Sequence, residues 1–259
     1  MDVKRRGFVI SVSGKGGVGK TLLSTLLLRT YLDETDKTIL MVDGDPATNL
    51  PEALGVEVKA TVANIAAKLK DDIQMGRVSY DASKRDMLEG WIYEILVENP
   101  RFDLLAMGRG EGEGCYCSVN YMLTLILTSL INNYDVTIMD MEAGLEHISR
   151  RVDSDVDVMF IVTDRSRMGL KTAARIKEVA EDVHVDVKRM VLIGNLFDKK
   201  DEHMLREYAD SIGLEYGGYI PYDENVSLYN MKGISILKLP DDSLSLLAVK
   251  SIARRLSIL

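Results

Sequence analysis

The chain has 259 residues, of which 46% are hydrophobic, which is enough to bury one substantial core, so we expect a single domain spanning residues 1–259. A formal net charge of -8 without any cluster of lysine and arginine argues against unaided binding to nucleic acid. No segment approaches the roughly 18 apolar residues that span a membrane, and the apolar run after the basic start is too short for a secretion signal. We therefore expect a cytoplasmic protein that acts on neither nucleic acid nor membranes.

Short apolar runs alternate with helical patterns along the whole chain. The runs predict strands at residues 7–13, 38–43, 102–107, 135–140, 156–163 and 188–195, with a short strand at 218–220. Helices are predicted at residues 20–32, within 62–97, and at 119–132, 170–183, 202–212 and 243–256. The alternation predicts a doubly wound α/β fold, in which helices cover both faces of a mainly parallel sheet and ligands bind at the carboxyl ends of the strands.

Residues 14–21 read GKGGVGKT and fit the P-loop pattern G-x-x-x-x-G-K-[ST], between a predicted strand and a predicted helix. The glycines allow backbone N–H groups to turn toward phosphate oxygens, and the following helix adds the positive end of its dipole. Lys20 is expected to reach the β and γ phosphates, and the Thr21 hydroxyl to bind Mg²⁺. We therefore expect a nucleoside triphosphate to be bound by Gly14, Gly16, Gly17, Val18, Gly19, Lys20, Thr21 and Leu22.

The predicted strand at 38–43 ends in Asp43, and Asp45 follows two residues later. Carboxylates at positions i and i+2 of an extended segment point to the same side, and phosphoryl transfer needs groups that position water and Mg²⁺. Such a pair can also cap a loop, so the pattern is informative mainly because it accompanies the P-loop. We expect both aspartates at the phosphate site.

Residues 51–100 form the longest interruption of the alternation and contain charged helical patterns with Trp91, the only tryptophan. Helices packed on the sheet are the favoured interpretation of this segment. A partner-docking surface is the alternative.

Both cysteines, Cys115 and Cys117, lie between the predicted strand at 102–107 and the predicted helix at 119–132, at the same edge of the sheet as the P-loop. The start of a helix lowers the pKa of a thiol and favours the thiolate, which is the metal-binding form. Two thiolates do not complete a tetrahedral site, but two pairs related by a dimer axis would supply four sulfur ligands at about 2.3 Å. Free buried cysteines, a redox pair and a local disulfide remain as alternatives.

The strand at 135–140 ends in Asp140, in the Walker B position, where a carboxylate holds Mg²⁺ through water. Gly144 follows and can present its N–H to the γ phosphate, a contact that exists only before hydrolysis. Residues 141–147 are therefore a candidate switch. His147, at the end of this stretch, is either part of the switch or interface or a surface histidine.

The form GKGGVGKT, with the additional Lys15, resembles the deviant Walker A motif of the MinD/ParA/nitrogenase-iron-protein class. This resemblance implies that the active unit is a homodimer, in which Lys15 reaches across to the nucleotide phosphates of the partner. It also implies that Asp45 orients the attacking water and that Asp43 supports the metal sphere. Lys15, Lys20 and Asp45 are accordingly the expected catalytic residues.

The same resemblance implies where the base binds. A strand-end asparagine, here Asn195, is the usual adenine contact of this class, and Pro221 with Tyr222 resembles its second adenine-side segment. Adenine is favoured over guanine because a guanine-specific NKxD motif would place lysine at Leu196. Asn195 as a simple helix cap or turn residue is the alternative.

The segment GCYCSVN around the two cysteines, together with DMEAGLEH at 140–147, looks like the CooC/AcsF branch of this class. These ATPases help to insert nickel into carbon monoxide dehydrogenase or acetyl-CoA synthase. The leading hypothesis is therefore an ATP-dependent metallochaperone: ATP closes the dimer around Ni²⁺ or Zn²⁺ held by Cys115 and Cys117, and hydrolysis to ADP reopens it. One departure is residues 162–167, where many relatives have a proline.

Two other functions remain open at this point. The segment 246–259 is amphipathic and slightly basic, as in a MinD-like ATPase that positions itself on a membrane, although a final helix packed on the sheet explains the same pattern. An iron–sulfur electron-transfer ATPase is the other alternative, but the resembling proteins of that kind have widely separated cysteines.

Overall fold

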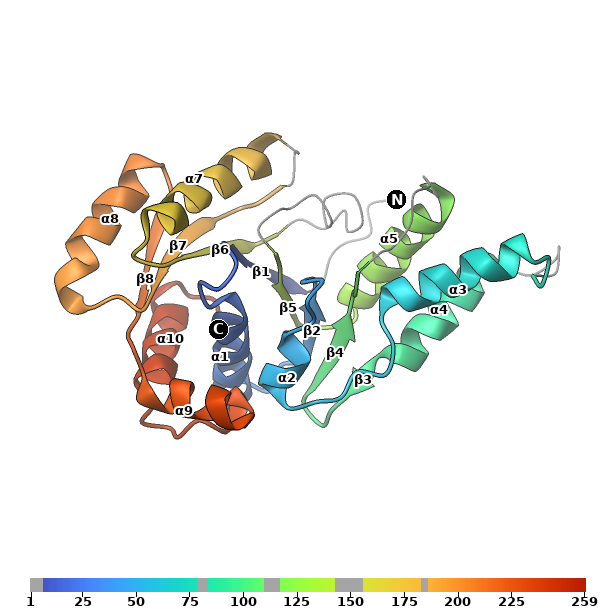
Figure 1. The fold of residues 1–259 in the computed structure, drawn as a ribbon, viewed down its shortest axis with the longest axis horizontal. Helices are drawn as coiled ribbons and strands as arrows, with labels where there is room; N and C mark the ends of the chain where they lie inside the picture. Colours follow the sequence, from blue (N-terminus) through green and yellow to red (C-terminus); the bar gives the residue numbers. More distant parts are fainter. Residues whose placement is uncertain (1–6, 79–82, 110–116, 143–155, 183–185) are drawn as a thin grey trace.

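The computed structural model in Figure 1 describes residues 7–78, 83–109, 117–142, 156–182 and 186–259, and of residues 117–121 it describes the backbone alone. Within these ranges eight strands form one sheet, in the order β3-β4-β2-β5-β1-β6-β7-β8. Their bounds are β1 Phe8–Gly14, β2 Ile39–Asp43, β3 Val97–Glu98, β4 Phe102–Ala106, β5 Val136–Asp140, β6 Val158–Thr163, β7 Met190–Asn195 and β8 Glu215–Ile220. Only the short β3 runs antiparallel to its neighbour, so the predicted mainly parallel sheet is confirmed.

Helices cover both faces of the sheet, because alternate residues of each buried strand point to opposite sides. On one face lie α1 Lys20–Glu34, α2 Leu50–Leu54, α9 Glu224–Lys232, the 3₁₀ turn η2 Ile236–Lys238 and α10 Leu244–Arg255. On the other lie α3 Val62–Gln74, α4 Lys84–Ile95, α5 Cys117–Ile131, α7 Arg167–Asp182 and α8 Glu202–Ser211, the last preceded by the 3₁₀ turn η1 Lys199–Asp201. In β1, for example, Ile10 packs in the core on the first of these faces and Val9 in the core on the second. The doubly wound arrangement expected from the sequence is thus confirmed.

The final helix, α10, is part of the core. It buries Leu246, Val249 and Ile252 in the same hydrophobic cluster as Leu27 of α1, and the Tyr31 hydroxyl of α1 donates a hydrogen bond to the carbonyl of Ile258. The apolar face that a membrane-surface helix would need is therefore already packed. Nowhere in the described ranges is a helix both long enough and apolar enough to cross a membrane.

The helical pair α3 and α4 packs beside α5, at the β3 end of the sheet, and extends past that edge in Figure 1. Its buried side chains, including Ile65, Leu69 and Ile92, join the same core cluster as Leu105 of β4 and Leu127 of α5. Both helices begin at a capping hydroxyl, from Thr61 and Ser83 in turn. The segment 51–100 therefore contains packed helices, as favoured from the sequence.

Five short elements were not predicted, and β8 begins earlier than expected. The missed elements are the 3₁₀ turns η1 and η2 together with β3, α2 and α9. In α9 no side chain is fully buried, and the helix begins because Asp223 caps it by accepting a hydrogen bond from the Asn225 N–H. In β8 the pattern is hidden by glycine, since a Cβ at Gly217 would lie 2.3 Å from a methyl group of Val191 on β7. Close strand packing explains this glycine.

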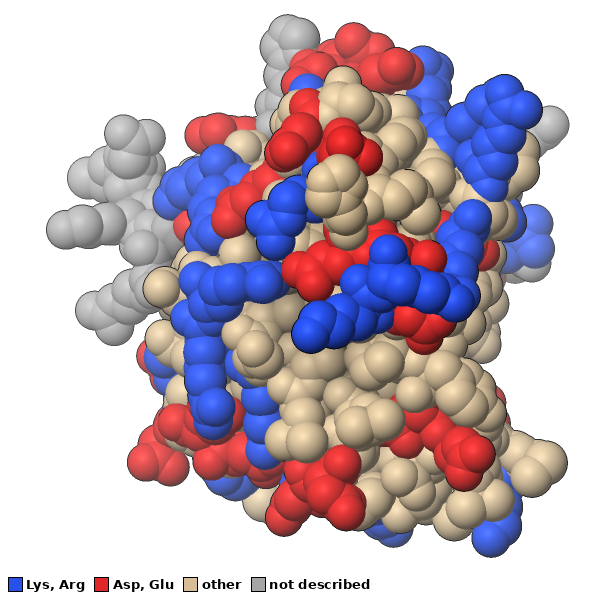
Figure 2. Space-filling model, turned by 90° about the vertical axis from the view of Figure 1, so that its left-hand side faces the viewer, with Lys and Arg blue, Asp and Glu red and all other residues tan. Residues whose placement is uncertain are grey.

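The surface on the α8 side of the molecule carries both signs of charge. Figure 2 shows lysine and arginine side chains interspersed with aspartate and glutamate over this face. Ion pairs of the neighbouring elements follow the same pattern, such as Arg189 with Glu215 at 2.7 Å and Arg206 with Glu202 at 3.4 Å. The positive charges on this face are therefore largely compensated by negative ones.

Candidate active site

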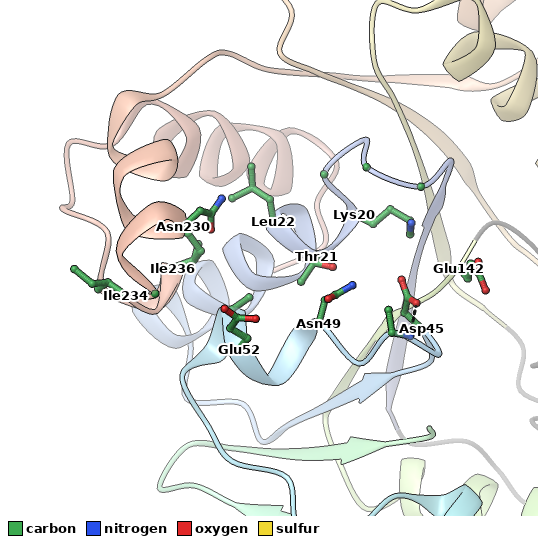
Figure 3. A pocket seen from close by; sticks show the side chains of 16 residues that line it. Lys20, Thr21, Leu22, Asp45, Asn49, Glu52, Glu142, Asn230, Ile234 and Ile236 are labelled. Carbon is green, nitrogen blue, oxygen red and sulfur yellow. Dashed lines mark hydrogen bonds between the residues drawn. The ribbon is translucent and has the colours of Figure 1, made fainter. Parts of the chain in front are cut away.

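A cavity of about 610 Å³ opens where β1 runs into α1, at the carboxyl edge of the sheet. Figure 3 shows Lys20 and Asp45 at one end of it and Asn230, Ile234 and Ile236 at the other. Its walls are formed by the P-loop, by the segment between β2 and α2 together with α2 itself, by Glu142, and by the end of α9 with η2. The lining residues are Gly16, Gly17, Gly19, Lys20, Thr21, Leu22, Asp45, Ala47, Asn49, Glu52, Ala53, Glu142, Asn230, Gly233, Ile234 and Ile236.

Two glycines of the loop are required by their surroundings. Gly19, the residue before α1, has a φ of 96°, and a Cβ there would lie 2.1 Å from Nδ2 of Asn195. At Gly14 a Cβ would lie 2.5 Å from the carbonyl oxygen of Val162. At Gly16 and Gly17, by contrast, a Cβ would meet no protein atom within 4 Å, and both residues line the cavity. The loop thus leaves open space where phosphate oxygens would approach its backbone.

The strand β5 brings Asp140 against the first turn of α1. The Thr21 hydroxyl donates to Oδ2 of Asp140 at 2.7 Å, and the Ser24 hydroxyl donates to Oδ1 at 3.2 Å. Lys20 lies on the same turn with only 6% of its surface exposed, and its Nζ donates to the carbonyl of Lys15 at 3.4 Å. A buried ammonium, two hydroxyls and a carboxylate therefore meet at the floor of the cavity.

Asp43 and Asp140 lie directly opposite each other on the neighbouring strands β2 and β5, and neither is exposed. Burial raises the pKa of Asp43 to about 7, although hydrogen bonds from the Asp45 and Leu50 N–H groups oppose the shift. Burial also raises the pKa of Asp140 to about 6, against the hydrogen bond from Thr21 and the charge of Lys20. The charge of Lys20 and the hydrogen bonds do not offset the effect of burial on the two pKa values, so a cation at the floor would stabilise the ionised carboxylates.

The segment after β2 folds over Asp43. Oδ1 of Asp43 accepts a hydrogen bond from the Asp45 N–H at 3.1 Å, and Oδ2 accepts one from the Leu50 N–H at 3.3 Å. Asp45 itself lines the cavity, with Oδ1 accepting from the Ala47 N–H at 2.9 Å, whereas Asp43 does not line it. The two carboxylates expected on one side are therefore separated: one braces the loop and the other faces the cavity.

The donor set fits a nucleotide with Mg²⁺. A threonine hydroxyl and a carboxylate are the oxygen ligands that this ion prefers, and it is usually held by one or two carboxylates together with substrate phosphates. Thr21 and Asp140 are already within 2.7 Å of each other, next to the buried Lys20. These residues therefore provide a set of groups whose chemistry suits a phosphate chain with Mg²⁺.

The three predicted adenine contacts lie outside the walls of the cavity. Asn195, at the end of β7, is only 5% exposed, and its Nδ2 donates to the carbonyl of Val18 at 2.8 Å. Its Oδ1 is buried and has no hydrogen-bond partner among the described residues. Pro221 accepts a hydrogen bond from Ser245, and Tyr222 is 56% exposed. Asn195 therefore contacts the P-loop through Nδ2, and its Oδ1 acceptor has no partner among the described residues.

Several predicted residues fall outside the described parts of the chain. These are Cys115, Gly144 and His147; Cys117 is the first residue of α5, and its side chain is not described. Since α5 follows β4 in a parallel sheet, its start lies at the carboxyl edge, as the P-loop does. Among the described residues, no group of three or more histidine, cysteine, aspartate or glutamate side chains forms a metal site.

Sequence reasoning missed several residues that the structure brings to the site. Ser24 could have been found, because it lies three residues after Thr21, on the same helical face. Glu142 and the lining residues from α2, α9 and η2 have no comparable signal. In the segment that departs from many relatives, Arg165 pairs with Asp198 at 2.7 Å and Asp201 at 2.9 Å, which ties the loop after β6 to the loop after Asn195.

Known proteins resemble this chain along most of its length. Residues 9–236 match the CobQ/CobB/MinD/ParA nucleotide binding domain. An uncharacterized ATP-binding protein of Methanocaldococcus jannaschii is 44% identical over 248 residues, which cover 96% of this chain and 98% of the relative. The carbon monoxide dehydrogenase accessory protein CooC of Rhodospirillum rubrum is 30% identical over 244 residues, covering 87% of this chain and 88% of that protein.

Solved structures agree with the fold described above. A ParA family ATPase from Chlorobium tepidum covers 96% of this chain and 98% of its own, with a TM-score of 0.69 and 20% identity. The septum site-determining protein MinD of Pyrococcus horikoshii, complexed with Mg-ADP, covers 96% of both chains with a TM-score of 0.68 and 20% identity. These similarities show the arrangement of strands and helices.

Proposed function

We propose that this chain, which belongs to the CobQ/CobB/MinD/ParA nucleotide-binding family, hydrolyses ATP to ADP and phosphate and uses this cycle to handle a metal ion for a client enzyme. The observation that carries the hydrolytic part is the floor of the cavity. There Lys20 is buried beside Asp140, and the Thr21 hydroxyl lies 2.7 Å from the same carboxylate. Phosphoryl transfer depends on positioning and charge more than on covalent chemistry, and this cluster supplies both.

Each residue has a distinct part in hydrolysis. Lys20 neutralises negative charge on the β and γ phosphates, and the backbone N–H groups of the loop orient them. Thr21 and Asp140 would hold Mg²⁺, which would supply positive charge against the charge that develops on the phosphates. Asp45, on the loop braced by Asp43, orients the attacking water. Lys15 acts from the second subunit of a nucleotide-dependent homodimer.

The orientation of the Asn195 amide favours adenine over guanine. Only the Nδ2 end can donate to the Val18 carbonyl, so this contact leaves Oδ1 as the group available to a base. An acceptor matches the exocyclic amine of adenine and opposes the O6 oxygen of guanine. Pro221 and Tyr222, which directly follow the adjacent β8, would complete the base site. We expect ATP to compete at least about tenfold better than GTP, since a misplaced acceptor costs about 1.4 kcal/mol or more.

The metal-handling part rests on the two cysteines and on one relative. The CooC protein of Rhodospirillum rubrum, with 30% identity, is named as an accessory protein of carbon monoxide dehydrogenase. Cys117 is the first residue of α5 and Cys115 precedes it by two positions in the sequence, and together with the same residues of a second subunit they would surround one soft metal, Ni²⁺ or Zn²⁺. The client would be carbon monoxide dehydrogenase or acetyl-CoA synthase, in the reducing cytoplasm, where both thiols stay unpaired.

Metal analysis combined with native mass tests the metal-handling cycle. The chain should be dimeric with ATP and carry about one metal per two chains. The double variant Cys115→Ser/Cys117→Ser should lose the metal and keep ATP hydrolysis. Met75→Ser removes a sulfur that is 73% exposed elsewhere on the surface and should change neither property. Unchanged metal content in the double variant, or a mass that does not respond to nucleotide, would exclude this cycle.

A further inference from the structure

The loop that joins β6 to α7 is fixed by its own side chains. Oδ1 of Asp164 accepts hydrogen bonds from the Ser166 N–H at 3.0 Å and from the Ser166 hydroxyl, and Ser166 Oγ accepts one from the Gly169 N–H at 2.9 Å. A Cβ at Gly169 would lie 2.2 Å from the same Asp164 oxygen, so a larger residue does not fit there. This turn holds Arg165 between two anchored residues, with 42% of its side chain exposed.

Arg165 contacts the loop after β7. Since β6 and β7 are neighbouring parallel strands, the loops that follow them lie at the same edge of the sheet (Figure 1). Nη2 of Arg165 lies 2.7 Å from Asp198 and 2.9 Å from Asp201. Its guanidinium also lies 5.7 Å from the centre of the Phe197 ring, which is fully buried. A single exposed ion pair contributes little, but one planar guanidinium that engages two carboxylates and a ring restricts the geometry of the whole loop.

The loop held in this way begins with a strained residue. Leu196 has a φ of 61°, a left-handed conformation that is unusual for a leucine. Such a conformation persists only where the surroundings impose it, and half of the Leu196 side chain is exposed, so its own packing does not account for it. The constraint comes from the next residue: the Phe197 N–H donates to the Ile220 carbonyl at 3.3 Å, and its ring lies beneath Arg165.

On its other side Leu196 adjoins Asn195, which fits closely against the P-loop. Nδ2 of Asn195 donates to the Val18 carbonyl at 2.8 Å, and a Cβ at Gly19 would lie 2.1 Å from the same nitrogen. There is consequently no spare room between the amide and the loop. A change in the backbone at Leu196 would therefore shift Asn195 relative to the P-loop.

We propose that Arg165 is a positioning residue for nucleotide selection: by holding Phe197, Asp198 and Asp201, it keeps Leu196 in its left-handed conformation and the Asn195 amide in place for adenine. Arg165 does not line the cavity, so it acts through Asn195 and not by contact with the nucleotide. The inference rests on the proposed function and adds to it a residue of the loop after β6.

Steady-state hydrolysis of ATP and GTP by the full chain tests the proposal. In Arg165→Ala the KM for ATP should rise about fivefold and the preference for ATP in kcat/KM should fall by a similar factor, while kcat for ATP stays within about twofold, since Lys20 and Thr21 are untouched. Arg165→Lys keeps the charge but cannot engage both carboxylates in one plane, so it should restore part of the preference. Urea unfolding reports whether each variant is folded.

Arg206→Ala is the matched control. This exposed arginine of α8 also makes an ion pair, with Glu202 at 3.4 Å, and lies 4.4 Å from the centre of the Tyr216 ring, yet it does not contact the loop after β7. It should leave KM and the preference unchanged.

Three results would overturn the positioning role and leave the proposed ATPase in place. These are an unchanged ATP preference in Arg165→Ala, an equal loss of preference in Arg206→Ala, and equal use of ATP and GTP by the unaltered protein. Failure of the unaltered protein to hydrolyse either nucleotide would instead overturn the proposed function, and the role of Arg165 with it.

Discussion

The two ends of the cavity are built in different ways. At the phosphate end, Asp140 of β5 accepts hydrogen bonds from Thr21 and Ser24 of α1, and Lys20, Asp43 and Asp140 are all buried. At the far end of the cavity, near Asn230 and Ile236, the walls come from the short α2 and from the end of α9 with η2, and Ser235 is hydrogen-bonded to the carbonyl of Ala53. The first end is rigid because the sheet fixes it, whereas the second depends on one tertiary contact. Mutations should therefore act more strongly at the phosphate end.

The largest effect is expected from Lys20→Ala, which removes the buried positive charge beside Asp140. ATP affinity or hydrolysis should fall about 100-fold or more, because the buried ammonium that would neutralise charge on the β and γ phosphates is lost. Isothermal titration with ATP and a phosphate-release assay measure both. Lys59→Ala, an exposed lysine after α2, should have no effect. A change of less than about threefold in Lys20→Ala would show that the phosphates bind elsewhere.

Next comes Gly19→Ala, which should destabilise the protein by about 2 kcal/mol. The new Cβ would stand 2.1 Å from Nδ2 of Asn195, at a φ of 96°. Urea unfolding measures the loss. Gly16→Ala is the matched comparison: its Cβ meets no atom, so folding stability should remain while nucleotide binding weakens. Equal stability of the two variants would contradict the rigid packing ascribed to the phosphate end.

A smaller effect is expected from Ser24→Ala, which leaves Asp140 with Thr21 as its only hydroxyl donor in the described structure. The Mg²⁺ concentration needed for half-maximal hydrolysis should rise about fivefold to tenfold, because the carboxylate is less firmly oriented. Thr25→Val is the control: this neighbouring hydroxyl is also buried but has no hydrogen-bond partner in the described structure. If both variants respond alike to Mg²⁺, Ser24 has no special relation to Asp140.

The smallest effect is expected away from the cavity walls, from Asp223→Asn. The Asp223 carboxylate accepts hydrogen bonds at the first turns of two helices. The donors are the Asn225 N–H of α9, and the Ser245 N–H and the Ser243 hydroxyl at the start of α10. Burial would raise the pKa of Asp223, but these donors outweigh it and hold the pKa below the usual 3.8. The variant should lose about 1 kcal/mol of stability at pH 7.

The pH dependence of that loss has a definite sign. Since the folded pKa of Asp223 is depressed, the stabilisation is present above the unfolded pKa of about 3.9 and disappears as the pH falls through the folded value. Urea midpoints of the protein and of Asp223→Asn should therefore approach each other as the pH falls below the unfolded pKa. The exposed Asp242→Asn serves as control and should show no such convergence. A constant difference at all pH values would mean that the ionised carboxylate is not what the donors stabilise.

The contrast between the two ends also explains how much could be predicted from the sequence. Lys20 and Thr21 follow from local spacing, because a strand, a glycine loop and a helix place these groups wherever they occur. Asp140 follows in the same way from a buried strand that ends in a carboxylate. The fold could be predicted for a similar reason, since buried strands and helices alternate with strong patterns.

The far end of the cavity could not be predicted, because no short-range pattern describes it. Glu52 and Asn230 are separated by most of the chain and meet only through the contact of α2 with η2. Asp43 shows a second limit. The rule that residues i and i+2 point the same way holds for extended backbone, and the chain leaves the strand at Gly44, whose N–H donates to the Asp140 carbonyl at 2.8 Å. Asp43 therefore points inward and Asp45 toward the cavity.

The amide of Asn195 has an evolutionary consequence. Its Nδ2 donates a hydrogen bond to the Val18 carbonyl of the P-loop, and its Oδ1, which has no partner among the described residues, is the proposed acceptor for the base. A replacement by aspartate, which would suit guanine, would set a carboxylate oxygen against the Val18 carbonyl and disturb the loop. A change of nucleotide preference through residue 195 would therefore need a second substitution in the P-loop as well. Related sequences that bind a different base in this way should therefore differ from this one by at least two substitutions.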